Sequence, residues 1–328
     1  MSVRTFLLMS ILAGLPRPAA ALDVAGATPS GPAESAGDAR AIAVTFSEPM
    51  VPLSSPKESE GFCPLELQPR IEGRCRWQGT QVLTFEPASP LPPATAFSAR
   101  VPAGTRSKVS GGALEADYSW TFETVRPALL KSWPNEHEHW IALKPTILLQ
   151  FNLGMDPKRA RGALTLEETP LDDSVHIESV PVAVRRASSE EVKGAWPYAW
   201  WGVDPSTHNV LAVVPSRPLK ADRAYVLRLA ADLRSAEGEL GLAAPRELDF
   251  ETYYSFRFLG SRPGVPFCLP GEAALLFSNP VKYKDLAAAL SFDPPVAMAE
   301  MPDWLKEHAG ERRPRERQVF LRLPGPDL

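Results

Sequence analysis

An internal repeat constrains the fold of this 328-residue chain more than any other feature of its sequence. Residues 82–97 (VLTFEPASPLPPATAF) align without gaps with residues 210–225 (VLAVVPSRPLKADRAY), which lie 128 positions later. The same spacing places Phe122-Glu123-Thr124 on Phe250-Glu251-Thr252. Because two separated segments agree at one spacing, the sequence indicates that one structural unit is duplicated.

A second segment occurs three times along the chain. It reads AVTFSEPM at 43–50, LLQFNLGMD at 148–156 and ALLFSNPV at 274–281. The second copy has additional residues before Val210, and we predict that this insertion includes Ser188–Asp204. The sequence therefore predicts three units, of which the second is enlarged.

Alternation within the repeated segments predicts β-strands. Ile42, Val44 and Phe46 are apolar at every second position, so that they share one face of a half-buried strand. The chain contains 35 prolines, which are poorly tolerated inside helices but fit turns and strand edges. We therefore predict an all-β protein of tandem immunoglobulin-like β-sandwich modules, each large enough to bury its own core.

These observations predict five segments along the chain. They are a signal peptide, a flexible lead-in, a first module, a second module with a Trp-rich insertion, and a truncated third module. Their predicted bounds are 1–21, 22–38, 39–126, 127–256 and 257–328. Residues 319–323 match the strand that begins at Val82, and no closing F-E-T strand follows them, so we expect the sequence to be the N-terminal piece of a longer protein.

The N-terminus predicts export. Arg4 precedes an apolar run at 6–15, and Ala19-Ala20-Ala21 offers small residues for signal-peptide cleavage. The run is shorter than the roughly 20 residues that span a bilayer, although an uncleaved anchor is an alternative. We expect a periplasmic or cell-envelope protein with no membrane span in the mature chain. A net charge of −4 argues against nucleic acid as a partner.

The chain has three cysteines, Cys63, Cys75 and Cys268. Cys63 and Cys75 are close enough in sequence to form a disulfide in an oxidising compartment, but the spacing leaves the pairing open. Cys268 then has no partner within the chain.

Several phrases of the first unit resemble a known family. They are AVTFSEPMVPL at 43–53, CPLELQP at 63–69, RWQGTQVLTFEP at 76–87, SPLPPATAFSARVPAG at 89–104 and WTFETVRP at 120–127. They resemble the N-terminal Ig-like region of bacterial α2-macroglobulins and, more broadly, bacterial SbsA-type Ig-like modules. The resemblance covers about residues 40–300.

The resemblance implies a protease trap, an endopeptidase inhibitor with a bait region and in many members an internal thioester. A thioester needs a C-x-E-Q type sequence, which none of the three cysteines has. We therefore expect this chain to be a non-catalytic region, with proteases bound through a downstream part of the protein.

Two motifs suggest binding chemistry. His137 and His139 lie two residues apart and could share one face of a strand, but no recognisable further ligand accompanies them, so we expect a polar loop and no metal site. The second motif is a run of aromatic residues that could bind glycan or peptide, or could pack on its own module. Packing is the favoured interpretation, yet this run is our first choice for a partner surface: Trp196, Tyr198, Trp200 and Trp201.

No H-E-x-x-H, G-x-S-x-G or phosphate-binding glycine motif occurs, so we expect neither an enzyme nor a cofactor. Three hypotheses remain for the function. The first is the arm of an α2-macroglobulin-like inhibitor. The second is an envelope scaffold or adhesin that binds glycan or protein. The third is an accessory region of a polysaccharide-active enzyme.

Overall fold

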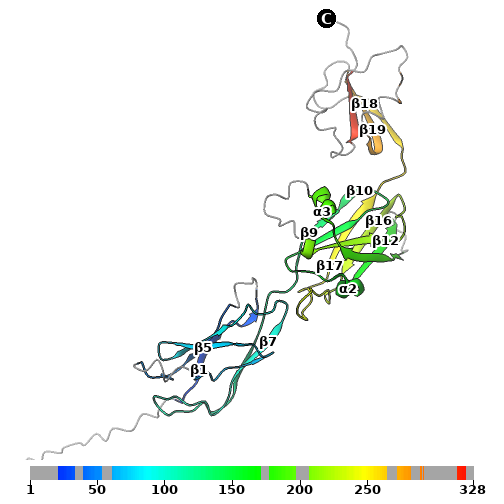
Figure 1. The fold of residues 1–328 in the computed structure, drawn as a ribbon. Coiled ribbons are helices and arrows are strands. Elements are labelled where there is room, and N and C mark those ends of the chain that lie inside the picture. The colour runs from blue at the N-terminus through cyan, green and yellow to red at the C-terminus, as the bar shows by residue number, and fades with distance from the viewer. Residues whose placement is uncertain are drawn as a thin grey trace, which may run out of the picture. The chain divides into compact units, whose positions relative to one another are not determined.

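The computed structural model describes residues 21–33, 40–53, 61–170, 177–196, 207–263, 272–281, 289, 291 and 316–322. The chain divides into two compact units, Met1–Val125 and Arg126–Leu328. Both are built mainly from β-strands arranged in several sheets, which confirms the predicted all-β, Ig-like architecture (Figure 1). The predicted signal peptide lies outside the described residues except for Ala21.

The first unit is a sandwich of two four-stranded sheets, with orders β1-β3-β6-β5 and β2-β8-β7-β4. Its strands are β1 (Val24–Thr28), β2 (Gly31–Pro32), β3 (Ile42–Phe46), β4 (Glu66–Gln68), β5 (Gly73–Gln78), β6 (Val82–Pro87), β7 (Ala96–Val101) and β8 (Tyr118–Glu123).

The second unit contains a larger sandwich, whose sheets have the orders β14-β15-β11-β9 and β10-β17-β16-β12-β13. Its strands are β9 (Leu129–Trp133), β10 (Glu138–Ile141), β11 (Ile147–Phe151), β12 (Leu164–Pro170), β13 (Glu178–Val180), β14 (Val182–Arg186), β15 (Val210–Pro215), β16 (Arg223–Leu229) and β17 (Arg246–Thr252). Short helices connect some of them: α2 (Pro157–Ala160), η1 (Arg161–Ala163), α3 (Ser189–Ala195) and η2 (Thr207–Asn209).

The second unit also contains a three-stranded antiparallel sheet, β18-β19-β20. Its strands are β18 (Phe258–Pro263), β19 (Glu272–Val281) and β20 (Glu316–Arg322). The third copy of the repeated segment forms β19, and the strand predicted near Val319 forms β20 beside it. A truncated third module with bounds 257–328 stays a prediction.

The duplication extends to the pairing register. β3 pairs with β6 so that Ile42 faces Phe85, and β11 pairs with β15 so that Ile147 faces Val213. On the second sheet, Phe97 of β7 faces Phe122 of β8, and their rings stack with centroids 5.1 Å apart. Their counterparts, Tyr225 of β16 and Phe250 of β17, stack at 5.7 Å. All these side chains are buried, so the two modules place equivalent residues in equivalent positions.

The predicted flexible lead-in is wrong for the residues that the structure describes. β1 pairs with β3, and Leu22 and Val24 are buried in the same core cluster as Val44 and Phe46. The first module therefore begins near Leu22 and not at residue 39. Gly, Ala and Pro in this segment suggested flexibility, but small residues also fit a strand whose apolar positions are few.

The first strand of each module divides between the two sheets. β1 joins one sheet, and β2 pairs parallel with β8 in the other sheet. In the second module β9 pairs with β11, and β10 pairs parallel with β17. A proline with a cis peptide bond follows β1 and β9 at the same place, at Pro29 and Pro134.

A two-way hydrogen bond closes the start of all three copies. In each copy, the residue just before the first strand is bonded twice to the residue that follows the repeated phenylalanine. The latter residue donates its backbone N–H to the carbonyl of the former, and its side-chain oxygen accepts the backbone N–H of the former. The N–H to side-chain distances are 2.9, 2.7 and 2.7 Å for Asp23 to Ser47, Ala128 to Asn152 and Arg257 to Ser278. The return bonds measure 2.8, 3.1 and 2.9 Å. The polar residue in T-F-S, Q-F-N and L-F-S is therefore fixed by the fold.

A buried threonine closes the other end of the first module. Thr124 Oγ1 lies 2.7 Å from the carbonyl of Pro92, and it accepts the backbone N–H of Thr95 at 2.9 Å. Next to it, Ala94 adopts a positive φ of 48° and donates its N–H to Val125 O at 2.9 Å.

The second module repeats this corner 128 residues later. Thr252 Oγ1 lies 2.8 Å from the carbonyl of Lys220 and accepts the N–H of Arg223 at 3.3 Å. Asp222 has a positive φ of 57° and donates its N–H to Tyr253 O at 3.0 Å. Because every partner is shifted by the same number of residues, the final threonine of F-E-T is a structural residue in both modules.

Candidate functional site

The predicted partner surface begins at Trp196, which ends helix α3 (Figure 1). Its N–H donates to Val192 O at 3.0 Å, and its ring is half-buried. It packs against an outer apolar cluster of the second module that consists of Leu148, Ala187, Val192, Val210 and Ala212. Trp196 therefore serves at least in packing, as favoured above. Tyr198, Trp200 and Trp201 lie outside the described residues.

Helix α3 fixes the start of the insertion. Ser188 and Glu191 form a capping box, in which Glu191 N donates to Ser188 Oγ at 3.2 Å and Ser188 N donates to Glu191 Oε2 at 2.9 Å. Arg185 of β14 donates two hydrogen bonds to the same carboxylate. The Arg185 guanidinium lowers the pKa of Glu191 from its ordinary 4.5 to about 2.

Trp196 also lines a groove of about 500 Å³ beside β9. β9 is an edge strand, and its bulge residue Leu130 is 57% exposed. Lys131, Glu136 and Arg246 add charge to the same lining. A groove with one indole, one exposed leucine and several polar groups has the mixed character of a peptide or sugar site.

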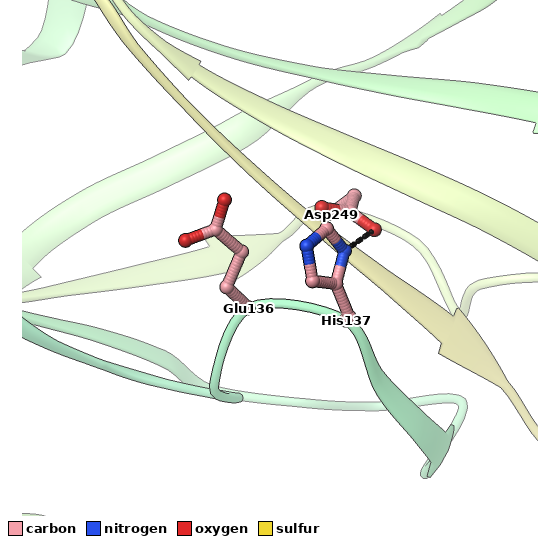
Figure 2. Close-up of side chains that lie close together, drawn as sticks. All are labelled: Glu136, His137 and Asp249. Carbon is pink, nitrogen blue, oxygen red and sulfur yellow. Dashed lines mark hydrogen bonds and ion pairs between the residues drawn. The ribbon is translucent and has the colours of Figure 1, made fainter.

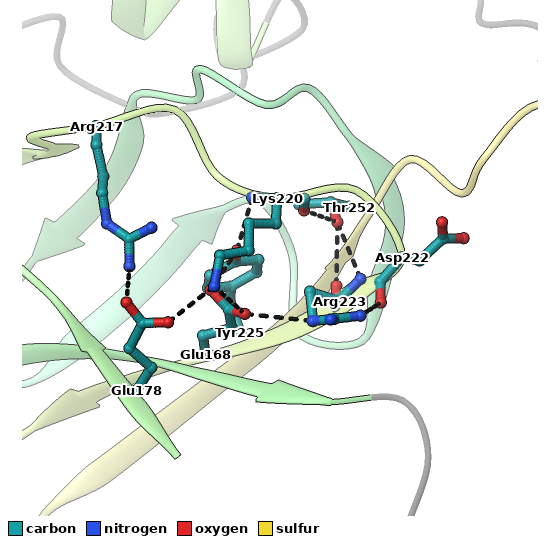
Figure 3. A network of polar contacts seen from close by, with 8 residues as sticks. All are labelled: Glu168, Glu178, Arg217, Lys220, Asp222, Arg223, Tyr225 and Thr252. Carbon is teal, nitrogen blue, oxygen red and sulfur yellow. Dashed lines mark hydrogen bonds and ion pairs between the residues drawn. The ribbon is translucent and has the colours of Figure 1, made fainter. Parts of the chain in front are cut away.

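A buried carboxylate organises the opposite part of this module (Figure 3). Glu168 of β12 is 4% exposed, and its carboxylate lies 3.0 Å from Lys220 Nζ and 3.2 Å from Arg223 Nε. Tyr225 donates its hydroxyl to the same carboxylate at 3.2 Å, and burial raises the pKa of Tyr225. A buried charge needs such partners, and here it has two cations and a phenol.

Further contacts extend this network to the surface. Glu178 of β13 bonds to Lys220 Nζ at 2.8 Å and to Arg217. The pKa of Lys220 is raised, first by its bond to Glu178 and then by its bond to Glu168. The network ties β12, β13 and the loop before β16 together, which favours a structural role. No sequence motif singles out Glu168, although its alternation with Leu164 and Leu166 places it on the inward face of the strand.

A disulfide joins Cys63 to Cys75 of β5, with Cα atoms 5.5 Å apart. The spacing of the two cysteines alone leaves this pairing open. Beside it, Phe62 stacks on Trp77 with ring centroids 5.7 Å apart, and Trp77 Nε1 donates to Phe62 O at 3.0 Å. These contacts hold the segment before β4 against β5, an edge strand. Cys268 lies outside the described residues.

His137 and His139 each meet a carboxylate of β17. His137 Nδ1 lies 2.7 Å from Asp249 Oδ2, and His139 Nδ1 lies 3.0 Å from Glu251 Oε2. These partners are more than a hundred residues away in the sequence, which is why the motif alone could not reveal them.

Comparison with known proteins finds a family model that matches part of the chain. Residues 18–124 match a bacterial Ig-like domain. The match covers the first module, begins before its first strand and ends at Thr124 of the threonine corner. No curated protein matches the chain. None of these findings points to α2-macroglobulins in particular.

Three solved structures illustrate the structural neighbours. PcoC, a copper resistance protein from Escherichia coli, is 18% identical, with 38% of this chain and 98% of that chain covered and a TM-score of 0.24. An L,D-transpeptidase from Mycobacterium tuberculosis H37Rv is 16% identical, with 48% and 72% covered and a TM-score of 0.22. The N-terminal part of the bacterial S-layer protein SbsC is 7% identical, with 70% and 44% covered and a TM-score of 0.21. At such values none of the three carries an argument about what this chain binds or catalyses.

Within the described part of the chain, no helix combines the length and the apolar character needed to cross a membrane.

Proposed function

We propose that this chain is a non-catalytic structural arm of an exported bacterial protein, in which Ig-like modules act as spacers in the envelope. The observation that carries the proposal is the repeated hydrogen-bond skeleton. Its polar residues, Thr124, Thr252 and the residues that follow each repeated phenylalanine, bond to backbone groups of their own module. Modules built in this way can be placed in series, because each contains its own core.

Two further observations support export. The Cys63–Cys75 disulfide suits an oxidising compartment, and the apolar N-terminal run suits a signal peptide. The match of residues 18–124 to a bacterial Ig-like domain is a further support for export.

Expression with the native N-terminus in a Gram-negative host tests the proposal. We expect the protein in the periplasmic fraction, with a new N-terminus near Leu22 by mass spectrometry and one reactive thiol under non-reducing conditions. A cytoplasmic protein with an intact N-terminus and three reactive thiols would contradict it. Limited proteolysis should also release stable fragments that begin or end near residue 125.

In its finer form, the proposal makes the parent protein an α2-macroglobulin-like endopeptidase inhibitor. The support is the set of phrases at 43–53, 63–69, 76–87, 89–104 and 120–127. The complete gene product, mixed with a broad-specificity protease, should block cleavage of a large protein substrate while cleavage of a small peptide continues. Unchanged cleavage of the large substrate would reject the inhibitor and leave the spacer proposal intact.

A second candidate is an adhesin that binds glycan or protein through the Trp-rich insertion. The groove beside Trp196 and the exposed Leu130 favour it. The intact protein can be screened on a glycan array and against envelope proteins, in parallel with Trp200→Ala and Trp201→Ala variants. Phe256→Ala is the matched control, because Phe256 is an exposed aromatic residue outside the insertion, at 61% exposure. Binding that survives both Trp substitutions would reject this candidate.

A further inference from the structure

Three potential metal ligands meet where β10 begins. Ligand atoms of Glu136, His137 and Asp249 all lie within 4.8 Å of one another. Figure 2 shows the Asp249 carboxylate on one side of the His137 ring and the Glu136 carboxylate on the other. Asp249 comes from β17, and the other two residues come from the turn before β10, so that the strand pairing itself brings the group together.

The imidazole of His137 is held in place before any ligand binds. Its Nδ1 lies 2.7 Å from Asp249 Oδ2, and its backbone N–H donates to the carbonyl of the same residue at 2.9 Å. The backbone of His137 has a φ of 60°, a conformation that residues other than glycine seldom adopt. A carboxylate on one ring nitrogen is the usual way in which a metal-binding histidine is oriented, and it leaves Nε2 available on the side of Glu136.

A second histidine–carboxylate pair adjoins the first. His139 and Glu251 lie two residues further along each strand, with Nδ1 and Oε2 3.0 Å apart. Asp249 and Glu251 alternate with the buried Leu248 and Phe250, so that both carboxylates lie on the outer face of β17. This face therefore offers two imidazoles together with several carboxylates.

The first module indicates that the fold does not require this group. There β2 pairs with β8 in the same parallel arrangement, with Gly31 facing Phe122 as Glu138 faces Phe250. By this register, Ser30 and Thr121 take the places of His137 and Asp249. The first module forms the same strand pair without a histidine, so that the cluster is an addition to the second module.

We propose that Nε2 of His137 and the Glu136 carboxylate form a surface site for a divalent transition metal of the zinc type, in which Asp249 orients the imidazole through Nδ1. Imidazole together with carboxylates suits Zn²⁺ and its neighbours in the first transition row. Ca²⁺ prefers six to eight oxygen ligands, which a site with a central imidazole does not supply. The sequence alone does not reveal this arrangement, because Asp249 is 112 residues away and is brought close only by the sheet.

Isothermal titration calorimetry with Zn²⁺ on the full-length, tag-free protein tests the proposal. The background carries His176→Asn, His308→Asn and Cys268→Ser, so that ligands outside the described residues do not compete. We expect one site whose affinity falls at least ten-fold in His137→Gln and several-fold in Glu136→Gln. His208→Asn is the matched control from the same module and should leave the affinity unchanged.

Each result has a defined meaning. If His137→Gln binds Zn²⁺ as tightly as the background protein, the site is wrong. If His137→Gln disturbs β10, as judged by hydrogen exchange, then Glu136→Gln decides, since its side chain is exposed. Unchanged affinity in that variant would also overturn the proposal. Displacement of Zn²⁺ by a hundred-fold excess of Ca²⁺ would reject the zinc-type class, and retention of Zn²⁺ would support it.

Discussion

The two sandwich modules share their hydrogen-bond skeleton and differ in what is added to it. Thr124 and Thr252 form the same corner, and Phe97–Phe122 and Tyr225–Phe250 form the same ring pair. Among the residues that the structure describes, the second module carries additions that the first lacks, namely α3, the Glu168 network and the histidine–carboxylate pairs. The residues shared by both modules are those that the fold itself requires. The residues found in the second module alone are the candidates for a function beyond folding.

The edge strand shows this difference most clearly. β5 and β14 occupy equivalent edges, each paired with the central strand that follows it, β6 or β15. The first module secures this edge with the Cys63–Cys75 disulfide. In the second module β14 leads directly into α3, and Arg185 of β14 holds the capping residue Glu191. One edge of the fold is therefore stabilised by a covalent bond in one copy and by a helix cap in the other.

The largest expected effect comes from the shared ring pair. Phe122→Ala and Phe250→Ala should each destabilise their own module by about 3–5 kcal/mol, because each removes a buried ring and leaves a cavity. Hydrogen exchange with mass spectrometry on the intact protein reports the two modules separately. Leu53→Ala, at a side chain that is 82% exposed, should have almost no effect. A large effect in only one module would break the equivalence.

The disulfide should give the next largest effect, and only in the first module. Replacing Cys63 and Cys75 by Ser should destabilise that module by about 3 kcal/mol, since the bond closes a short loop in the unfolded chain. Exchange rates in β15–β17 should stay the same. An equal loss in both modules would show that they do not unfold independently.

The threonine corners should respond equally to removal of the hydroxyl. Thr124→Val and Thr252→Val keep the shape of the side chain but leave buried backbone groups without a partner, at a cost of about 1–3 kcal/mol. Urea unfolding followed for each module measures the loss. Thr45→Val is the control, because this strand side chain is exposed. Unequal losses at the two corners would locate a real difference between the modules.

The smallest effect concerns pH and only the second module. Arg185 and the Ser188 N–H lower the folded-state pKa of Glu191 to about 2, below its ordinary 4.5. The carboxylate therefore contributes stability that is fully present above pH 4.5 and is lost as pH falls towards 2. Exchange in α3, corrected for intrinsic rates, should increase over this range, and Glu191→Gln should remove that increase. If exchange in α3 of the unsubstituted protein does not change between pH 4.5 and 2, Glu191 does not stabilise this helix in the way proposed.

Sequence analysis predicted those parts of the fold that repeat or alternate. The spacing of 128 residues placed Leu83 on Leu211 and Phe122 on Phe250 in the correct register, because alternation fixes the buried side of a strand. The pattern of apolar residues does not reveal β1, since V-A-G-A-T has a single large apolar side chain. Burial of Val24 depends on Phe46, a contact that the local composition does not encode.

The candidate sites were harder to predict because they depend on contacts between distant strands. Cys63 and Cys75 were recognisable by proximity, and their pairing needed the geometry of β5. His137 gave a local signal, but Asp249 looked like an ordinary surface residue on another strand. Glu168 was recognisable in principle, since a charged residue on the inward face of a strand needs partners.

The divided first strand also determines how a module would respond to tension. β2 lies parallel to β8, and β10 lies parallel to β17, so that the first and last strands of each module are neighbours. Pulling a module by its two ends slides these strands past each other in shear, and their hydrogen bonds must break together instead of one after another. An envelope component built from such modules would resist stretching by the arrangement of its strands, without any need for a larger core.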